Sequence, residues 1–194
     1  MQNDDQFFNI RAGQLADLDP CLRLDSDHQS EMVWQMYRSD ESLLGVETFF
    51  RAVRLPRVAE GSYPREQEEL LANLHQQDCF LVATVSEEAT SHDEQPLERV
   101  IGFTGLHEQR WQHTGWVQNI VVDQAWRRRG VGTALFRAVA TWARGERLHR
   151  LILEAPTKNG SAISFFHGLG ATFCGFNDRY YTNGDIAVFF EYRL

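Results

Sequence analysis

The chain has 194 residues, a formal net charge of −8 at pH 7, and 43% hydrophobic and 12% aromatic residues. This is an ordinary globular composition that excludes a disordered chain, and the acidic balance argues against nucleic acid as the main partner. No apolar run approaches the roughly 18 residues of a membrane span, and the amino end lacks the basic and apolar stretches of a secretory signal. We therefore expect one soluble, cytoplasmic domain spanning residues 1–194, with no membrane partner.

The cysteines and histidines do not form a metal-binding pattern. Cys21, Cys79 and Cys174 are far apart and include no CxxC pair, which predicts buried, reduced thiols without a zinc site or a disulfide. The seven histidines include no HExxH, and His107 and His113 lack further ligands nearby. We therefore expect no metal. An acidic surface favours a cationic substrate such as an amine.

The first half of the chain predicts one strand and several short helices. In chain order these are a strand over Phe7–Gly13, a short helix capped by Asp17 with Pro20 in its first turn, a helix over Ser30–Tyr37, an irregular stretch over Ser39–Arg65, and a helix over Glu66–Gln76. The second of these helices depends on Met32, Val33 and Met36, which would share one helical face.

The second half alternates between strands and helices. Its expected elements are strands over Cys79–Val85, Val100–Leu106 and Gly115–Val122, a solvated loop over Ser86–Glu98, a helix over Gly130–Arg144, a strand over Leu148–Glu154, a helix over Asn159–Leu169 closed by Gly170, and strands over Thr172–Tyr181 and Ile186–Tyr192 joined through Asn183-Gly184. A strand–helix–strand crossover implies at least one parallel pair in a mixed sheet.

The segment from Ile120 to Leu135 has the features of a site for a phosphate anion. A strand ends near Asp123, an arginine-rich turn follows, and a helix begins near Gly130. The first turn of a helix has unpaired N–H groups and about half a positive charge. Gly130 and Gly132 leave those groups uncovered, and Arg127–Arg129 add positive charge beside them.

Other phosphate-binding motifs fit this segment less well. A dinucleotide-binding GxGxxG would need glycine at Leu135, and a P-loop would need GK[ST]. The pattern Arg127-x-x-Gly130-x-Gly132 after a Val-Val strand end resembles the acetyl-CoA motif of the GNAT acetyltransferases. The alternative is an arginine-rich turn whose glycines serve only helix packing. The resemblance assigns the following residues to acetyl-CoA: Ile120, Val121, Val122, Arg127, Arg128, Arg129, Gly130, Val131, Gly132 and Thr133.

A second stretch, Asn159 to Gly170, resembles the later motif of the same family. Asn159, Ala162, Phe165 and Gly170 match in register. Asn159 joins the cofactor set and is also a plain helix cap, while Ala162 and Phe166, one helical turn apart, would line the pantetheine arm. From Trp116 onward the chain is most similar to the streptothricin acetyltransferase branch.

The resemblance implies a fold and a division of the chain. The fold is α/β (α+β), a single GNAT domain with a mixed, mostly antiparallel sheet of six to seven strands, flanked by helices and holding a central parallel pair. Residues 79–194 would form the acetyl-CoA-binding core. Residues 1–78 would supply the first strand, variable helices and substrate-side loops, with residues 25–76 shaping the acceptor pocket.

Two departures from the family pattern concern the chemistry. Phe166 stands where the family often has the tyrosine that protonates the departing thiolate, and Ala171 stands where phenylalanine is expected. Tyr180 or Tyr181 could supply the missing acid, although adjacent tyrosines also serve packing. The thioester oxyanion would bind a backbone N–H near Val122, as in the family.

Deprotonation of the acceptor amine is the step for which a base matters most. An alkyl ammonium with a pKa near 10.4 is neutral about once in 2,500 molecules at pH 7, a cost of about 4.6 kcal/mol. Glu154 at a strand end is the first candidate base, or else a structural carboxylate, and Glu108 and His107 come next.

The expected function is N-acetyl transfer from acetyl-CoA to a primary amine, with a small-molecule acceptor. The alternatives are a protein N-terminal or lysine acetyltransferase, a non-catalytic acyl-CoA sensor of the same fold, and a scaffold or nucleic-acid module using the arginine turn. A homodimer is left open.

Overall fold

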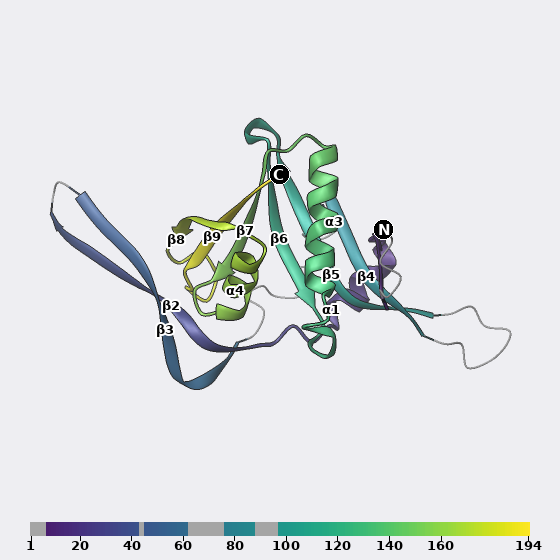
Figure 1. Cartoon of the computed structure of the whole chain (residues 1–194), viewed down its shortest axis with the longest axis horizontal. Helices are drawn as coiled ribbons and strands as arrows, with labels where there is room; N and C mark the ends of the chain where they lie inside the picture. Colours follow the sequence, from purple (N-terminus) through teal and green to yellow (C-terminus); the bar gives the residue numbers. More distant parts are fainter. Residues whose placement is uncertain (1–6, 43–44, 62–75, 88–96) are drawn as a thin grey trace. The chain divides into compact units, whose positions relative to one another are not determined.

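The structure, a computed structural model, describes residues 7–42, 45–61, 76–87 and 97–194 (Figure 1). Seven strands form one mixed sheet in the order β1-β4-β5-β6-β7-β9-β8, and two more form a separate antiparallel pair, β2-β3. The sheet strands are β1 (Asn9–Ala12), β4 (Cys79–Glu87), β5 (Leu97–Gln109), β6 (Thr114–Val122), β7 (Arg150–Pro156), β8 (Thr172–Asn177) and β9 (Ala187–Arg193). The expected fold class, including the number of strands, is confirmed.

The described chain forms two compact units. The first contains residues up to Ser26, then Arg65–Leu153 and Glu191–Leu194; the second contains Asp27–Pro64 and Glu154–Phe190. In the first unit β5 pairs antiparallel with β4 and β6, and β6 pairs parallel with β7 from Thr114↔Arg150 to Val117↔Leu153. This is the parallel pair that the strand–helix–strand crossover predicts.

Helix α3 (Val131–Gly145) is the crossover between β6 and β7. Its apolar side chains recur every three to four residues, and that face is buried: Val131, Leu135, Val139 and Ala143 are at most 1% exposed. Val131 and Leu135 pack with Ala83 of β4 and Ile101 of β5 in one core cluster. The start of α3 is therefore fixed against the middle of the sheet.

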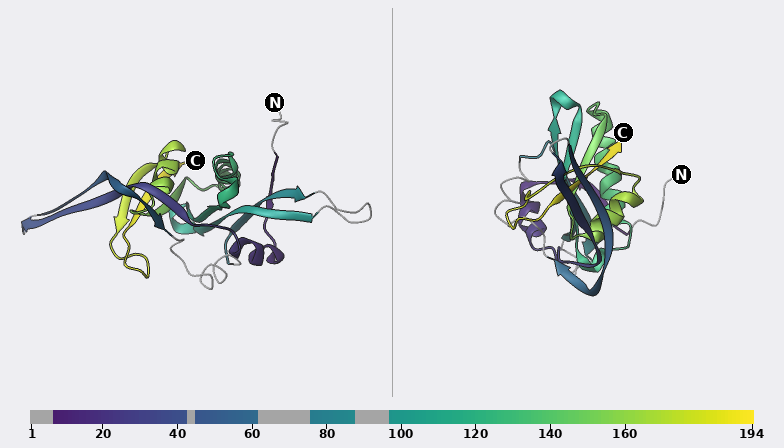
Figure 2. Two further views of the ribbon diagram at one scale, coloured as in Figure 1. Left: turned by 90° about the horizontal axis from the view of Figure 1, so that it is seen from below. Right: turned by 90° about the vertical axis from the view of Figure 1, so that its left-hand side faces the viewer.

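The largest error of the sequence analysis lies in the second unit. The stretch predicted as a helix over Ser30–Tyr37 is part of β2 (His28–Ser42), and the stretch predicted as irregular over Ser39–Arg65 contains β3 (Gly45–Gly61). Figure 2 shows β2 and β3 side by side as a long two-stranded ribbon. Gly45 and Gly61 are the two ends of β3. Pro56 falls where the register slips, between the pairs Met32↔Arg54 and Ser30↔Ala59, a place where a strand tolerates proline.

The remaining elements of the second unit follow the prediction more closely. Helix α4 (Gly160–Gly168) is capped by Asn159, whose Oδ1 accepts the Ala162 N–H at 2.9 Å, and Gly170 adopts φ +89° after it. Strand β8 ends at Asn177, so the predicted strand over Thr172–Tyr181 is too long. Gly184 (φ +79°) still closes a turn by donating its N–H to the Tyr181 carbonyl, within a longer β8–β9 connection.

The amino-terminal helix forms with Asp17 at its N-cap position as predicted, but without the expected side-chain capping bond. Helix α1 (Leu18–Leu22) follows a single 3₁₀ turn (Leu15–Asp17), and the Asp17 side chain does not cap it. Both carboxylate oxygens of Asp17 accept hydrogen bonds from the Arg11 guanidinium, at 2.7 and 2.9 Å. This hydrogen bonding keeps the pKa of Asp17 below its ordinary value. Asp17 Oδ2 also accepts the Gln14 N–H at 2.8 Å, so the carboxylate caps the 3₁₀ turn that leads into α1.

None of the three cysteines is in a disulfide bond, and two of them are buried as expected. Burial raises the pKa of Cys21 and of Cys79 to about 12, so both stay protonated. Cys174 on β8 is exposed, against the prediction.

Two predicted segments, the helix over Glu66–Gln76 and most of the loop over Ser86–Glu98, lie outside the described residues. Within the part of the chain that is described, none of the helices has the length and apolar character that crossing a membrane requires.

Candidate functional site

In the first unit, β6 and α3 are joined by a turn with unusual backbone geometry. Asp123 opens it by accepting the Ala125 N–H at 3.0 Å, and a 3₁₀ turn over Gln124–Trp126 follows. Arg128 (φ +62°) and Gly130 (φ +85°) then adopt left-handed backbone. The chain thus passes from the extended Arg127 through these two left-handed residues into the first turn of α3.

The first turn of α3 presents its N–H groups without a capping side chain. The N-cap is Gly130, and the first intrahelical bond runs from the Ala134 N–H to the Gly130 carbonyl at 2.9 Å. The N–H groups of residues 131–133 therefore precede the helical ladder, at the positive end of a 15-residue helix. A Cβ built on Gly130 meets nothing within 4 Å, so the space in front of the helix is open. We call residues 128–133 the α3 cradle.

The three arginines of the turn differ in what they contact. Arg127 donates from Nε to the Val122 carbonyl (3.0 Å) and from a terminal nitrogen to the Asp25 carbonyl (2.9 Å), so it braces the turn. The Arg129 guanidinium lies over the Trp126 ring, 5.0 Å from its centroid. Arg128 is exposed. Arg128 and Arg129 therefore remain the stronger candidates for phosphate contacts.

A β-bulge interrupts β6 before it reaches the cradle. Gly105 of β5 faces Asn119, but Leu106 faces Val117, so Gln118 has no opposite residue in the register. Its side chain accepts a hydrogen bond from Gln77 at 2.9 Å. Bulges occur next to active sites because they re-aim backbone groups. The sequence analysis missed this feature, although the polar pair Gln118-Asn119 inside an apolar strand marks it.

The other predicted cofactor residues of β6 and α3 differ in their exposure to solvent. Val121 is buried, while Ile120 and Val122 are half-buried toward the end of β6. Gly132 and Thr133 are half-buried in the first turn of α3.

In the second unit, the candidate base and one candidate acid form a hydrogen-bonded pair. The Tyr180 hydroxyl donates to Glu154 Oε2 at 2.9 Å. Glu154 is half-buried on β7, and Tyr180 is 38% exposed, so the pair is reachable from solvent. Tyr181 is buried, and its ring stands edge-on to that of Tyr180 at 5.1 Å. Both tyrosines lie in the connection after β8, and not on a strand as predicted.

That connection is tied to the start of α4. Lys158 forms an ion pair with Asp185, and the Asp185 carbonyl accepts the Tyr181 N–H at 3.3 Å. These contacts hold the two tyrosines in place.

The secondary base candidates lie elsewhere in the first unit. Glu108 of β5 faces Gly115 of β6. Gly115 is seven residues before Val122 on the same strand, a distance of roughly 23 Å. Glu108 pairs with Arg110 at 3.4 Å, and His107 pairs with Asp78 at 3.0 Å. The structure thus separates both from the α3 cradle and gives each an ionic partner.

The cofactor candidates on α4 have defined surroundings inside the second unit. Asn159 uses its side-chain oxygen as a cap, and Ala162 is half-buried. Phe166 is buried, with its ring centroid 5.7 Å from that of Phe190. Their assignment to acetyl-CoA stays a prediction.

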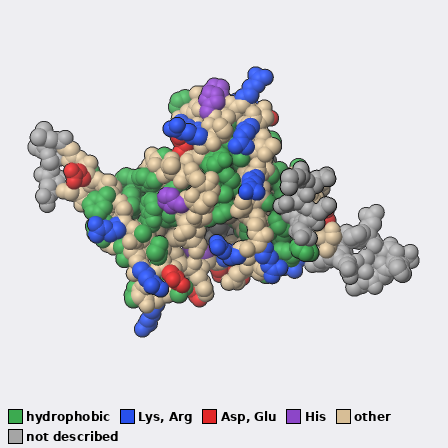
Figure 3. All heavy atoms as spheres, in the orientation of Figure 1, with side chains coloured by type: hydrophobic (Ala, Val, Ile, Leu, Met, Phe, Trp, Pro, Cys, Tyr) green, Lys and Arg blue, Asp and Glu red, His purple; other side chains and the backbone are tan. Residues whose placement is uncertain are grey.

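The described residues show no metal cluster, and the face drawn in Figure 3 shows no basic stripe. The described residues contain no group of three or more His, Cys, Asp or Glu able to hold a metal ion. On the face drawn in Figure 3, basic side chains are dispersed among hydrophobic and neutral ones.

The sequence matches a known family over most of its length. The model of the Acetyltransferase (GNAT) family matches residues 23–171. The chain therefore belongs to the GNAT acetyltransferase family.

Particular relatives point to one branch of that family. Streptothricin acetyltransferase A of Bacillus subtilis is 30% identical over 88 residues, covering 43% of this chain and 51% of that protein. Streptothricin acetyltransferase of Streptomyces lavendulae is 30% identical over 80 residues, covering 41% and 42%. The matched stretch thus spans about half the length of these relatives or less.

Solved structures show the same fold at lower identity. Nourseothricin acetyltransferase superposes with a TM-score of 0.77 at 20% identity, over 96% of this chain and 98% of that one. A Bacillus anthracis structure titled as a streptothricin acetyltransferase in complex with acetyl coenzyme A has a TM-score of 0.69 at 20% identity, over 96% and 99%.

Proposed function

We propose that this protein is an N-acetyltransferase that moves an acetyl group from acetyl-CoA to a primary amine on a small molecule. The observation that supports it most is the α3 cradle, an uncapped helix start behind two left-handed residues inside the matched family region. Such a helix start suits the pyrophosphate of CoA. The streptothricin acetyltransferase relatives favour a small-molecule acceptor over a protein.

The residues that would hold acetyl-CoA fit an anionic group. The N–H groups of residues 131–133 supply donors, and Arg128 and Arg129 supply charge. Val122, at the end of β6, is the nearby source of a backbone N–H for the thioester oxyanion.

In the reaction, the amine nitrogen attacks the thioester carbonyl, the C–S bond breaks and CoA leaves as a thiol. Glu154 takes the proton that the ammonium must lose, and the Tyr180 hydroxyl, bonded to Glu154 Oε2, orients the carboxylate. The sulfur receives a proton from Tyr180, from Tyr181 or from solvent. An acyl-CoA sensor of the same fold is the second candidate, because Phe166 cannot supply that proton.

The experiment is a measurement of CoA release over a panel of primary amines, with Glu154→Gln as the test variant. We expect kcat/KM for an alkyl amine to fall at least about 100-fold in Glu154→Gln. The loss should shrink at high pH, where the amine is already neutral. Acetyl-CoA binding without CoA release for any amine would select the sensor.

A further inference from the structure

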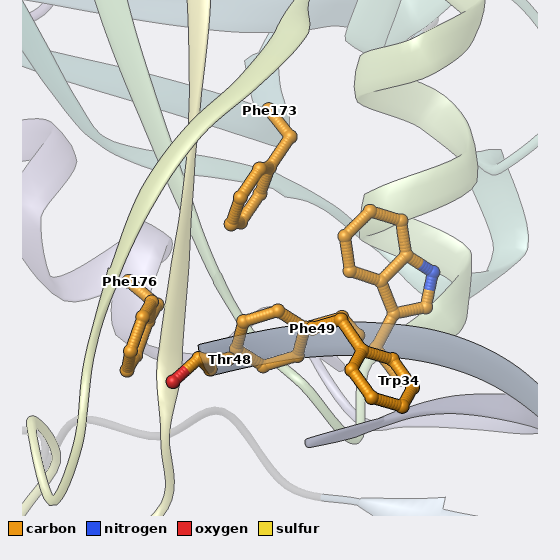
Figure 4. A pocket seen from close by; sticks show the side chains of 6 residues that line it. Trp34, Thr48, Phe49, Phe173 and Phe176 are labelled. Carbon is orange, nitrogen blue, oxygen red and sulfur yellow. The ribbon is translucent and has the colours of Figure 1, made fainter. Parts of the chain in front are cut away.

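The second unit contains a pocket whose walls are almost entirely aromatic. Its volume is about 330 Å³, and Figure 4 shows its side chains. The lining residues are Trp34, Thr48, Phe49, Phe50, Phe173 and Phe176. None of these side chains is charged, in a chain of which 24% of the residues are Asp, Glu, Lys or Arg.

The rings of the pocket hold one another in place. Phe50 of β3 contacts Phe173 and Phe176 of β8, with centroids 5.6 and 5.2 Å apart, and Trp34 of β2 contacts Phe50 at 6.1 Å. These tilted and edge-on arrangements are the favourable ones for aromatic pairs. The walls are therefore formed before a ligand arrives.

Buried backbone contacts fix Trp34 from behind. The backbone N–H of Trp34 donates to the Thr157 carbonyl at 2.8 Å. Ser30, buried on the same strand, donates to the Met32 carbonyl at 2.7 Å and accepts the Gly160 N–H at 2.9 Å. Together these bonds join β2 to the start of α4. A rigid wall of this kind lowers the ordering cost of binding.

Packed aromatic rings connect the pocket to Phe166, the residue that the family register places beside the thioester. Phe173 contacts Phe190 at 6.1 Å, and Phe190 contacts Phe166 at 5.7 Å. Phe166, Phe190 and the pocket all belong to the second unit. A ligand in the pocket thus packs against Phe173, which packs against Phe190, which in turn packs against Phe166.

We propose that this pocket, given the function proposed above, binds an uncharged apolar group of the acceptor, so that arylalkyl and long-chain alkyl amines are the preferred substrates. Phe49, Phe173 and Phe176 are 52%, 42% and 38% exposed without a ligand, and covering them with an apolar group is favourable. The lining offers no carboxylate for a second ammonium. A polyamine would therefore lose hydration there without gaining a partner.

The test compares 2-phenylethylamine with propylamine as acceptors in the CoA-release assay. We expect kcat/KM to be at least tenfold higher for 2-phenylethylamine, because burial of its ring is favourable. Phe176→Ser and, separately, Phe49→Ser should lower this ratio toward one. Trp111→Ser, which removes an 80% exposed ring from the first unit, should leave the ratio unchanged.

The outcomes separate this inference from the proposed function. Equal rates for both amines, or a ratio that neither serine variant lowers, overturns the pocket assignment while the acetyltransferase activity stands. A preference for an amine bearing a trimethylammonium group would also overturn it, in favour of a cation cage. If no amine releases CoA, 2-phenylethylamine is titrated into the protein with tryptophan fluorescence as the signal. Saturable binding that Phe176→Ser removes supports the pocket although the function has failed, and absence of binding overturns both.

Discussion

A glycine stands at the start of both α3 and α4, as the N-cap of α3 (Gly130) and as the first residue of α4 (Gly160), but the two starts are built in opposite ways. At α3, Gly130 supplies left-handed backbone and no capping side chain, so the first-turn N–H groups are presented to open space. At α4, the Gly160 N–H is taken by Ser30 Oγ and the Ala162 N–H by Asn159 Oδ1. The donors of α4 are therefore used by the protein itself, and only α3 has the form of an anion site.

The two glycines also differ in why no other residue fits. Gly130 is required by its backbone angle, since a Cβ there would have ample room. Gly160 is required by space, since a Cβ there would lie 2.2 Å from the Met32 carbonyl oxygen. Backbone conformation thus explains the glycine at position 130 in the candidate cofactor site, and close packing explains the glycine at position 160 where α4 meets β2.

Substitution of Gly160 should have the largest effect on stability. In Gly160→Ala the added Cβ must displace β2 from α4, and we expect unfolding free energy to fall by about 1–3 kcal/mol. Denaturant unfolding measures this change. Gly168→Ala is the matched control in the same helix, because a Cβ there meets nothing within 4 Å. Equal stability of Gly160→Ala and the wild type would show that β2 and α4 are not in close contact.

Substitution of Gly132 should have the largest effect on cofactor binding. In Gly132→Val a branched side chain would stand in the first turn of α3, where the pyrophosphate is proposed to bind. We expect acetyl-CoA affinity to fall at least tenfold, about 1.4 kcal/mol, in a calorimetric titration. Gly145→Val, at the other end of the same helix, is the control. A folded Gly132→Val protein with unchanged affinity would overturn the assignment of the cradle.

The contrast between the units also explains which parts of the fold were predictable. Helix α3 packs a single face on a sheet, so its apolar residues recur with the helical period. In β2 the register is continuous from Met32 to Ser39, but apolar residues stand on both faces of the strand, so Met32, Val33 and Met36 imitate a helical face. The ribbon consists of two long strands whose burial depends on contacts elsewhere in the second unit. Local periodicity could not reveal those contacts.

The candidate site was likewise predictable only where its residues are close together in the sequence. The glycines and arginines of the cradle are adjacent in the sequence, so their spacing was sufficient to find them. Ser30 and Gly160 are 130 positions apart, and the Tyr180–Glu154 bond joins positions 26 apart. Only the folded chain reveals those pairs. The aromatic pocket likewise combines β2, β3 and β8, two of which the sequence did not predict as strands.

Removal of the α4 cap should have an intermediate effect. Asn159→Ala loses the bond to the Ala162 N–H and should lower the unfolding free energy by about 1 kcal/mol. Asn159→Asp retains an acceptor and serves as the control. Titrating both variants with acetyl-CoA then tests whether Asn159 of α4 also contacts the cofactor. An affinity loss shared by both variants would mean that the amide contacts the cofactor, and affinity retained by Asn159→Asp would mean that Asn159 is a cap alone.

Removal of the two outer arginines should have a smaller, salt-dependent effect. The double variant Arg128→Ala/Arg129→Ala should bind acetyl-CoA about two- to fivefold more weakly at low salt, and the difference should fade as ionic strength rises. Arg127→Ala is a contrasting variant, since it removes the brace on Val122 and Asp25 and should lower stability as well. Salt-independent affinity in the wild type would indicate that Arg128 and Arg129 do not face phosphates.

The smallest expected effect concerns Phe166, where the family often has a tyrosine. Phe166→Tyr adds a hydroxyl to a buried ring packed against Phe190, and a hydroxyl without a partner there costs about 1–3 kcal/mol of stability. If thiolate protonation limits turnover, kcat should rise about two- to threefold with little change in KM for acetyl-CoA, well below the effect of a fully positioned acid.

Tyr180→Phe and Tyr181→Phe are the matching variants, because each removes a hydroxyl that could protonate the thiolate. Of these, Tyr180→Phe also removes the bond to Glu154, so a slowing that high pH relieves would identify it as a positioning residue for the base. A wild type unaffected by either loss and not accelerated by the gain would mean that solvent protonates the thiolate, and that catalysis comes mainly from placing the amine against the thioester.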